Sequence, residues 1–285
     1  MNSEQRFPRQ AISAMVIVAF AMMAYHTYSL AASTYSGCGG EVLSPTNVAY
    51  EARVVELVNE IRATHNLPPM KLSAELTNSA RYHAADMRQD DYVNHNTFDR
   101  DNGVLVPICD WDTRISLYYA GQGGLGENLS AGYATPQEAI DGWMNSSGHQ
   151  EQILGDYREI GVGYDEGYWV QDFGVREDYY PLVINREAQE TDSTEVSLYI
   201  YGNWEQMRLR NDDGTWSEWQ AFAPEISWSL RNQAGERRVE VEISNGTSQA
   251  SASDTIVLTT ETPVTPSPMP TANGSATIYL PTIHQ

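Results

Sequence analysis

Apolar residues recur at every third or fourth position in two stretches near the start of the chain, a spacing that predicts amphipathic helices. The first stretch follows the capping residues 46–47 and is ended by the turn-forming residues 66–69. The second begins after Ser73, which can cap it, and ends near residues 90–91. His83 shares the apolar side of this second helix, so we interpret it as a packed core residue and keep a ligand role as the alternative.

A third predicted helix has the clearest start. Thr135, with Pro136 at the first helical position and Glu138 three residues after the threonine, fits a capping box. We expect residues 147–148 to end this helix. His149 would then lie just past a helix end, from where an imidazole can project into a cleft.

The pattern changes to alternation in the second half of the chain. Residues 160–164 and 168–173 are strand-like runs joined by a turn, which predicts a hairpin. Between 195 and 260, short strand-like runs, including the segment Trp216–Trp219, are spaced by turns and predict a small β-sandwich. The run 238–243 alternates charged and apolar residues, as a strand with one buried face and one wet face does.

Two regions lack strong periodicity. Residues 92–134 predict a long irregular region, which in a compact domain tends to be functional. Within it, the fragment 99–103 resembles a calcium loop, but its glycine comes one place early and no glutamate follows at the required distance, so we expect a turn. The tail, residues 261–285, is rich in Thr, Pro and Ser and ends in a short apolar patch that suits a docking strand or a sorting signal.

The N-terminus is typical of an export signal. Arg6 and Arg9 precede the apolar run 11–24, and small residues follow at 31–33, so residues 1–32 predict a signal peptide and residues 33–46 a linker. An uncleaved anchor is the alternative; after cleavage we expect no membrane span. We therefore expect a secreted or cell-surface protein.

Charge and cysteine content narrow the picture further. The chain has 38 acidic and 17 basic residues, a formal charge of −21, which repels phosphate backbones and excludes nucleic acid as a partner. In an exported protein the two cysteines, Cys38 and Cys109, suggest one disulfide, with two free buried thiols as the alternative.

Three residues of the first domain are candidates for chemistry. His95, Glu127 and His149 each stand next to a glycine or an asparagine rather than within an apolar pattern. Two imidazoles and a carboxylate are the ligand set of a catalytic zinc site with one open position. A hydrogen-bonded polar network that shapes a groove is the alternative.

Residues from about 54 to 173 resemble the CAP superfamily, the group of cysteine-rich secretory proteins, antigen 5 and pathogenesis-related proteins, in its bacterial form. The matching stretches are LVNEIRATHNLPPMKLSAELTNSARYHAADM, Asn94-His95, Gly126-Glu127-Asn128, WMNSSGH and IGVGYDEGYWVQDFG. The resemblance implies an α+β fold: a three-layer α-β-α CAP sandwich over residues 47–177, with a central antiparallel sheet and a large cleft. After a linker at 178–194, residues 195–260 resemble an immunoglobulin-like β-sandwich module.

The resemblance also implies a site. By motif position, His95 and His149 are the two histidines of the family's cleft and Glu127 is its Gly-Glu-Asn glutamate, so all three are cleft-binding candidates. The histidines are the candidate metal ligands and Glu127 the candidate catalytic residue. Ser146 stands where many relatives have a second glutamate, which removes one carboxylate from the set.

Three functions compete. The leading hypothesis is an exported binding protein whose cleft holds a small apolar ligand, a peptide or a metal, with a cell-wall or surface component as partner. The first alternative is a metal-assisted hydrolase of the peptidase kind, and the second is a structural envelope protein. The sequence requires no cofactor, and a divalent metal such as zinc is the one candidate.

Overall fold

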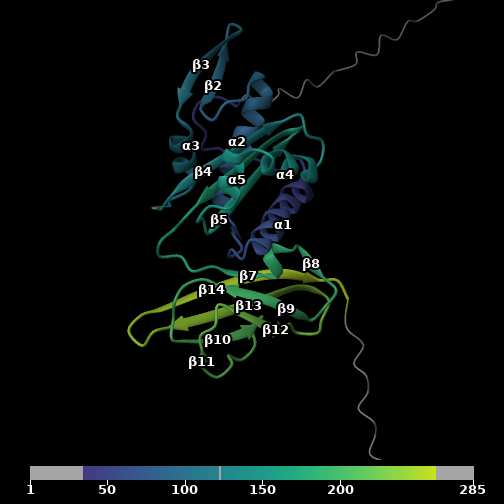
Figure 1. Cartoon of the computed structure of the whole chain (residues 1–285), viewed down its shortest axis with the longest axis vertical. Coiled ribbons are helices and arrows are strands. Elements are labelled where there is room, and N and C mark those ends of the chain that lie inside the picture. Colours follow the sequence, from purple (N-terminus) through teal and green to yellow (C-terminus); the bar gives the residue numbers. More distant parts are fainter. Residues whose placement is uncertain (1–34, 122, 261–285) are drawn as a thin grey trace, which may run out of the picture. The chain divides into compact units, whose positions relative to one another are not determined.

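The computed structural model describes residues 35–121 and 123–260. The first part of the chain forms a four-stranded sheet, in the order β1-β5-β6-β4, between two layers of helices (Figure 1). Its strands are β1 (Lys71–Leu72), β4 (Leu125–Ala131), β5 (Glu159–Asp165) and β6 (Tyr168–Gly174). β1 runs parallel to β5, and the other pairs are antiparallel. β4 comes last in the strand order and is therefore an edge strand.

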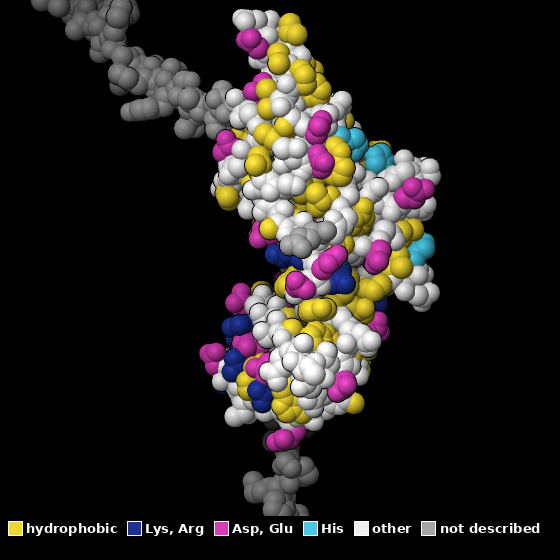
Figure 2. All heavy atoms as spheres, turned by 90° about the vertical axis from the view of Figure 1, so that its left-hand side faces the viewer, with side chains coloured by type: hydrophobic (Ala, Val, Ile, Leu, Met, Phe, Trp, Pro, Cys, Tyr) yellow, Lys and Arg dark blue, Asp and Glu magenta, His cyan; other side chains and the backbone are white. Residues whose placement is uncertain are grey.

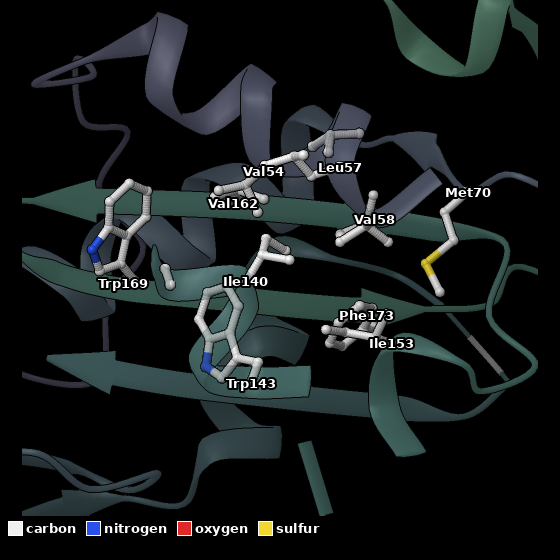
Figure 3. Close-up of a cluster of buried hydrophobic side chains, with 13 residues drawn as sticks. Val54, Leu57, Val58, Met70, Ile140, Trp143, Ile153, Val162, Trp169 and Phe173 are labelled. Carbon is white, nitrogen blue, oxygen red and sulfur yellow. The ribbon is translucent and has the colours of Figure 1, made fainter. Parts of the chain in front are cut away.

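One face of the sheet is covered by three helices, α1 (Val48–Thr64), α4 (Pro136–Met144) and α5 (Ser147–Ile153). Figure 3 shows their apolar side chains meeting those of β5 and β6 in one cluster. The fully buried members include Val54, Val58, Ile140, Trp143, Ile160, Val162, Trp169 and Phe173. The alternation of β5 therefore points Ile160 and Val162 into this cluster and turns its glycines to the opposite face.

The opposite face is covered by α2 (Ala74–Asp90), with α3 (Trp111–Tyr118) beside it. Gly161 and Gly163 of β5 lie against the main chain of α2 at Leu76 and Ala80, where any β-carbon would clash. These two glycines let the helix lie directly on the strand. The first domain is thus mixed α and β, with helices on both faces of the sheet as expected.

The predicted helix starts are confirmed. The Asn47 side chain accepts the Tyr50 N–H, and the Ser73 hydroxyl accepts the Leu76 N–H. Thr135 and Glu138 form the capping box at the start of α4. Each cap satisfies main-chain donors that a helix start leaves without partners.

The prediction that His149 lies past a helix end is wrong. α4 ends at Met144, but a second helix begins at Ser147 and places His149 in its first turn. Ser146 is the N-cap residue of this helix, although its side chain makes no capping hydrogen bond.

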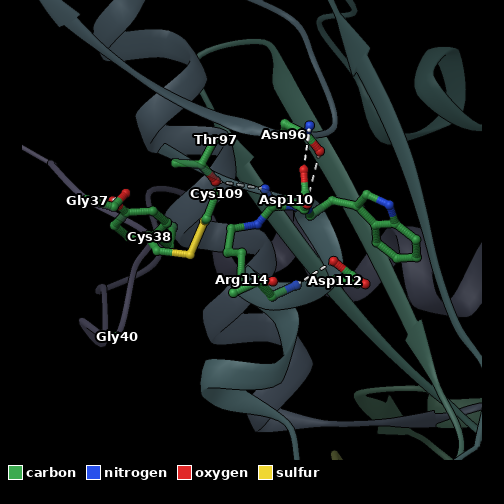
Figure 4. Close-up of a disulfide and its surroundings, with 12 residues drawn as sticks. Gly37, Cys38, Gly40, Asn96, Thr97, Cys109, Asp110, Asp112 and Arg114 are labelled. Carbon is green, nitrogen blue, oxygen red and sulfur yellow. Dashed lines mark hydrogen bonds between the residues drawn. A yellow bond between two sulfur atoms is a disulfide. The ribbon is translucent and has the colours of Figure 1, made fainter. Parts of the chain in front are cut away.

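The region 92–134 is not irregular. It holds a hairpin of β2 (Thr97–Asp101) and β3 (Val104–Cys109), then α3 and β4. Residues 102 and 103 turn the hairpin with φ values of 48° and 83°, so the expectation of a turn at 99–103 is confirmed. The predicted disulfide between Cys38 and Cys109 is present and ties the segment before α1 to the end of β3 (Figure 4).

The second part of the chain forms two further sheets, ordered β11-β10-β13-β14-β8 and β12-β9-β7. Their strands are β7 (Leu182–Ile184), β8 (Glu190–Thr191), β9 (Glu195–Ile200), β10 (Gln206–Asn211), β11 (Gln220–Ala221), β12 (Glu225–Ser229), β13 (Gly235–Ser244) and β14 (Gln249–Leu258). Their apolar side chains share one core, which is consistent with a sandwich. Residues 178–194, predicted as a linker, supply β7, β8 and the short helix η1 (Asn185–Glu187), whereas Trp216–Trp219 forms no strand.

A buried ion cluster joins the two parts. Lys71, the only lysine of the sequence, donates to Glu187 at 2.8 Å and also to Asp254 of β14. Burial and the charge of Asp254 raise the pKa of Glu187 to about 8, against the opposing effect of Lys71. At neutral pH Glu187 therefore largely keeps its proton, and the ammonium group compensates the remaining negative charge of a site that has little access to water.

No helix within the described ranges is long and apolar enough to cross a membrane. The predicted signal peptide, residues 1–32, and the tail, residues 261–285, lie outside the described residues.

Replacing the buried cation should be far more costly than replacing an exposed one. Lys71→Met leaves Glu187 and Asp254 without their counter-charge, so we expect the free energy of unfolding to fall by about 3–5 kcal/mol in denaturant titrations. Arg53→Met, which removes the half-exposed pairs to Glu56 and Glu60, should cost about 1 kcal/mol or less. Equal losses in the two variants would contradict the role given to Lys71.

Candidate functional site

The candidate residues gather at the edge strand β4. Along this strand, Glu127 lies opposite Asp172 of β6 and faces the side covered by α2 and α3, whereas the next residue, Asn128, faces the side of α4 and α5. His95 follows α2, and His149 belongs to α5. The edge of the sheet is therefore the place where side chains from both layers can approach each other.

Glu127 is held by two partners. Its side chain is 1% exposed, and its Oε1 lies 2.7 Å from Nδ1 of His95, whose side chain is 51% exposed. Its Oε2 accepts the guanidinium of Arg114, a fully buried residue of α3. Both carboxylate oxygens of Glu127 are thus engaged within the protein.

The electrostatics keep Glu127 ionised. Burial alone would raise the pKa of Glu127, but the Arg114 charge, together with the His95 hydrogen bond, outweighs it and holds the pKa below its ordinary value. A carboxylate with a lowered pKa is a weak proton acceptor at neutral pH. It is, however, well suited to hold the Nδ1–H tautomer of His95, which leaves Nε2 as the free ring nitrogen.

Arg114 also fixes the chain around His95. Its guanidinium donates to the main-chain oxygen of His95 at 2.8 Å and to the Thr97 hydroxyl at 3.1 Å. Arg114 and Thr97 are labelled in Figure 4. One arginine therefore positions the main chain of His95 and, through Glu127, its ring.

Two buried titratable residues lie behind the site. His83 is fully buried, bonds the main-chain oxygen of Asn94 at 2.8 Å and has its pKa lowered by burial to about 3, so the interpretation as a packed histidine is confirmed. Asp172 is also fully buried, and burial together with the charge of Glu127 raises its pKa well above its ordinary value. Asp172 therefore holds its proton more tightly than an exposed aspartate does, beside Glu127, whose pKa is lowered.

His149 reaches the site from the other layer. The Asn128 amide donates to the main-chain oxygen of His149 at 3.1 Å and to the Gln171 side chain at 3.0 Å, which ties α5 to β4. Burial and repulsion by His95 lower the pKa of His149. Figure 2 shows imidazole side chains side by side on one face of the protein.

The structure brings the three predicted residues to one strand edge but does not arrange them as three ligands. Across the ranges that the structure describes, His95, Glu127 and His149 are not a set whose ligand atoms lie within 4.8 Å of one another. Glu127 does not fit as a metal ligand, because its oxygens bind His95 and Arg114. The two imidazoles fit as nitrogen donors, with Glu127 in the orienting position behind a ligating histidine.

Sequence reasoning missed Arg114, Asp172 and the positioning role of Asn128. Arg114 is the only basic residue between Arg100 and Arg158, within an acidic stretch, which is a weak signal for a buried counter-charge. Asp172 interrupts an apolar strand run, where an acid is unusual. Neither pattern identifies the residue that Arg114 or Asp172 contacts, because these contacts depend on which elements pack together.

Two cavities in the described part of the protein lie away from these residues. One, of about 440 Å³, is lined by the loop after α1 and by β7 and β9; the other, of about 240 Å³, lies around Arg176 and Tyr179. Neither is lined by His95, Glu127 or His149; the His95 side chain is half-exposed, and His149 is half-buried.

Residues 55–173 match the family model of the cysteine-rich secretory protein family, CAP. The matched range begins in α1 and ends in β6, so it includes His95, Glu127 and His149. The similarity to this family is therefore shown for the first domain, in a range that is less than half of the chain.

The chain is 34% identical over 152 residues to the protein YkwD of Bacillus subtilis (strain 168), covering 52% of this chain and 56% of YkwD. It is 30% identical over 124 residues to the membrane protein YlbC of the same organism, covering 43% of this chain and 34% of YlbC. A solved extracellular protein containing an SCP domain, from Bacillus anthracis str. Ames, is similar with a TM-score of 0.40 and 26% identity, over 45% of this chain and 40% of that one. The chain thus spans less than two thirds of the length of the curated relatives it matches.

Asp172 should make stability depend on pH. Since its pKa is raised on folding, its contribution is complete below the unfolded pKa of about 3.9 and is lost as pH rises through the folded pKa. The side chain in Asp172→Asn cannot ionise. The melting temperature of this variant minus that of the wild type should therefore increase from pH 5 to pH 8. The control, Asp213→Asn in an exposed turn, should show no such trend. A difference between Asp172→Asn and wild type that does not change with pH would contradict a raised pKa for Asp172.

Proposed function

We propose that this protein is an exported CAP-domain protein that binds a ligand through His95 and His149 at the edge of β4. The observation that carries the proposal is the engagement of both Glu127 oxygens, by His95 and by Arg114. This arrangement uses the carboxylate to orient an imidazole and leaves the two histidines as the groups that face a ligand. The ligand is a small apolar molecule, a peptide or a divalent metal.

Export is supported by two features of the chain. The N-terminal pattern of two arginines, an apolar run and small residues is that of a signal peptide. The disulfide between Cys38 and Cys109 belongs to an oxidising compartment. Both favour a secreted or cell-surface protein, for which cell-wall components are the accessible partners.

A hydrolase is the weaker candidate. Metal-assisted hydrolysis would require Glu127 to bind the metal or to take a proton from water. Its lowered pKa and its two internal partners oppose both roles, and Ser146 offers no carboxylate in its place. Binding without chemical change therefore accounts better for the geometry.

Zinc is the first probe, because two neutral imidazoles are suitable donors for it. In calorimetric titrations near pH 7.5 we expect binding that is lost in His95→Gln and in His149→Gln. His65→Gln, at an exposed histidine after α1, is the matched control and should bind as the wild type does. Loss in the control as well, or retention in both site variants, would overturn the assignment of the two histidines to a metal.

If zinc does not bind the wild type, the same variants should be titrated with cell-wall peptides and with phospholipid vesicles. The proposal then predicts saturable binding to one of these that falls at least about tenfold in His95→Gln and His149→Gln, since each loses a hydrogen-bonding group at the contact. A folded wild-type protein that binds none of the three probes would favour the structural role.

The hydrolase candidate has its own test. We expect the purified protein to cleave no peptide from a mixed library, with or without added zinc. Cleavage that is lost in Glu127→Gln while circular dichroism shows a folded variant would establish Glu127 as catalytic and replace the binding proposal. Cleavage that survives in this variant would place the activity outside the site.

A further inference from the structure

Three aspartates gather where α2 meets the β2–β3 hairpin. Asp86 and Asp90 are one turn apart on α2, and Asp99 comes from β2. Each offers one carboxylate oxygen, and these oxygens lie within 4.8 Å of one another. Within residues 35–121 and 123–260, no other set of three acidic, histidine or cysteine residues comes this close. The fold thus concentrates three carboxylates at one point, outside the strand edge that carries the histidines.

The cluster has no ion-pair partner among the described residues. The arginines of the CAP domain that form ion pairs use other carboxylates, such as Glu51, Glu127, Glu159 and Asp165. Arg100, next to Asp99 in the chain, donates instead to the main-chain oxygens of Asp90 and Asp91. Arg114 donates to Glu127, to the main-chain oxygen of His95 and to Thr97 instead. The three acids are therefore left to repel one another.

Asp86 adds an independent observation. Its side chain is fully buried and its Oδ2 accepts the hydroxyl of Tyr92, but its Oδ1 is buried without any hydrogen-bond partner. A buried polar atom in this state costs about 1–3 kcal/mol, and more when it carries charge. Burial and the charges of Asp90 and Asp99 raise the pKa of Asp86 to about 7. A buried carboxylate oxygen of this kind is the ligand atom that a hard cation prefers.

We propose that Asp86, Asp90 and Asp99 bind a calcium ion. Calcium coordinates carboxylate oxygens at about 2.3–2.6 Å, so ligands on opposite sides of the ion lie about 4.8 Å apart. The oxygens of the three aspartates fall within that span as they stand. Magnesium prefers a strict octahedron that keeps several waters, whereas calcium accepts irregular sets of carboxylates such as this one.

The ion would hold together three segments that are distant in sequence. Asp99 also accepts the Gly37 N–H and the Ser36 hydroxyl, each at 3.2 Å, so it binds the segment that precedes α1. The disulfide of Cys38 fixes the same segment to the end of β3. Calcium would therefore link α2, the hairpin and this segment, and it would do so whether or not the histidines bind a ligand.

The test uses the purified full-length protein freed of metal with a chelator. We expect it to bind one calcium ion with a dissociation constant of about 10⁻⁴–10⁻³ M, the range of extracellular modules, and its melting temperature to rise with calcium. Asp99→Asn should weaken binding by roughly tenfold or more, since affinity follows the number of charged ligands. Asp101→Asn, the same charge change two residues away on the hairpin, should bind as the wild type does.

The sign of the stability change separates a cation site from a merely repulsive cluster. In chelator, Asp99→Asn removes repulsion and should melt no lower than the wild type; in calcium the wild type should melt higher than the variant. Terbium luminescence sensitised by Tyr92, which is bonded to Asp86, gives a second readout, and Asp99→Asn should shift its titration to terbium concentrations that are higher by roughly tenfold or more. Sodium chloride at matched ionic strength must not reproduce the calcium effect. No calcium response up to 10 mM (on the order of ten times the expected constant), or an equal response in Asp99→Asn, would overturn the proposal.

Discussion

The close packing of α2 on β5 is the constraint on which both candidate sites depend. Gly161 and Gly163 have no side chains to separate the helix from the strand, so α2 cannot rise from the sheet without opening the core at Leu76 and Ala80. The helix places His83 behind Glu127 and carries Asp86 and Asp90 towards the hairpin. A single side chain at either glycine would therefore displace residues of both sites together.

Charge compensation within the protein explains which buried acidic residues are suited to bind a cation and which are not. The sequence has 38 acidic and 17 basic residues, so cations are scarce. The fold assigns Arg114 to Glu127, Arg176 to Glu159 and Lys71 to Glu187 with Asp254. Glu127 is thereby neutralised within the protein and orients His95. Asp86 has no such partner, which makes its cluster the more suitable of the two acidic sites for a divalent cation.

The parts of the fold that depend on short-range chemistry could be predicted from the sequence. The caps at Asn47, Ser73 and Thr135 follow from side chains that bond main-chain groups two or three residues away. The restart of the helix at Ser147 was missed because Ser-Gly is typical of a helix end. The β2–β3 hairpin was missed for a different reason. Val104 and Val106 are 64% and 41% exposed, so the apolar residues of β3 mark no buried face.

The candidate sites could be predicted only in part. The family motifs indicate His95, Glu127 and His149, and the structure brings all three to β4. The role of Glu127, however, is decided by Arg114, which comes from a helix that shows no strong periodicity. Asp172 and the aspartate cluster likewise depend on contacts across the sheet and between α2 and β2. Pairings between distant segments are set by the fold as a whole, so no local pattern reports them.

Strand β2 connects the two sites physically. Thr97 and Asp99 both belong to this strand, with a shift of register between Thr97 and Phe98. Thr97 accepts a hydrogen bond from Arg114, the residue that sets the position of His95, while Asp99 belongs to the aspartate cluster. The contact that helps to hold Arg114 and one ligand of the aspartate cluster therefore come from the same short strand, although the two sites share no residue.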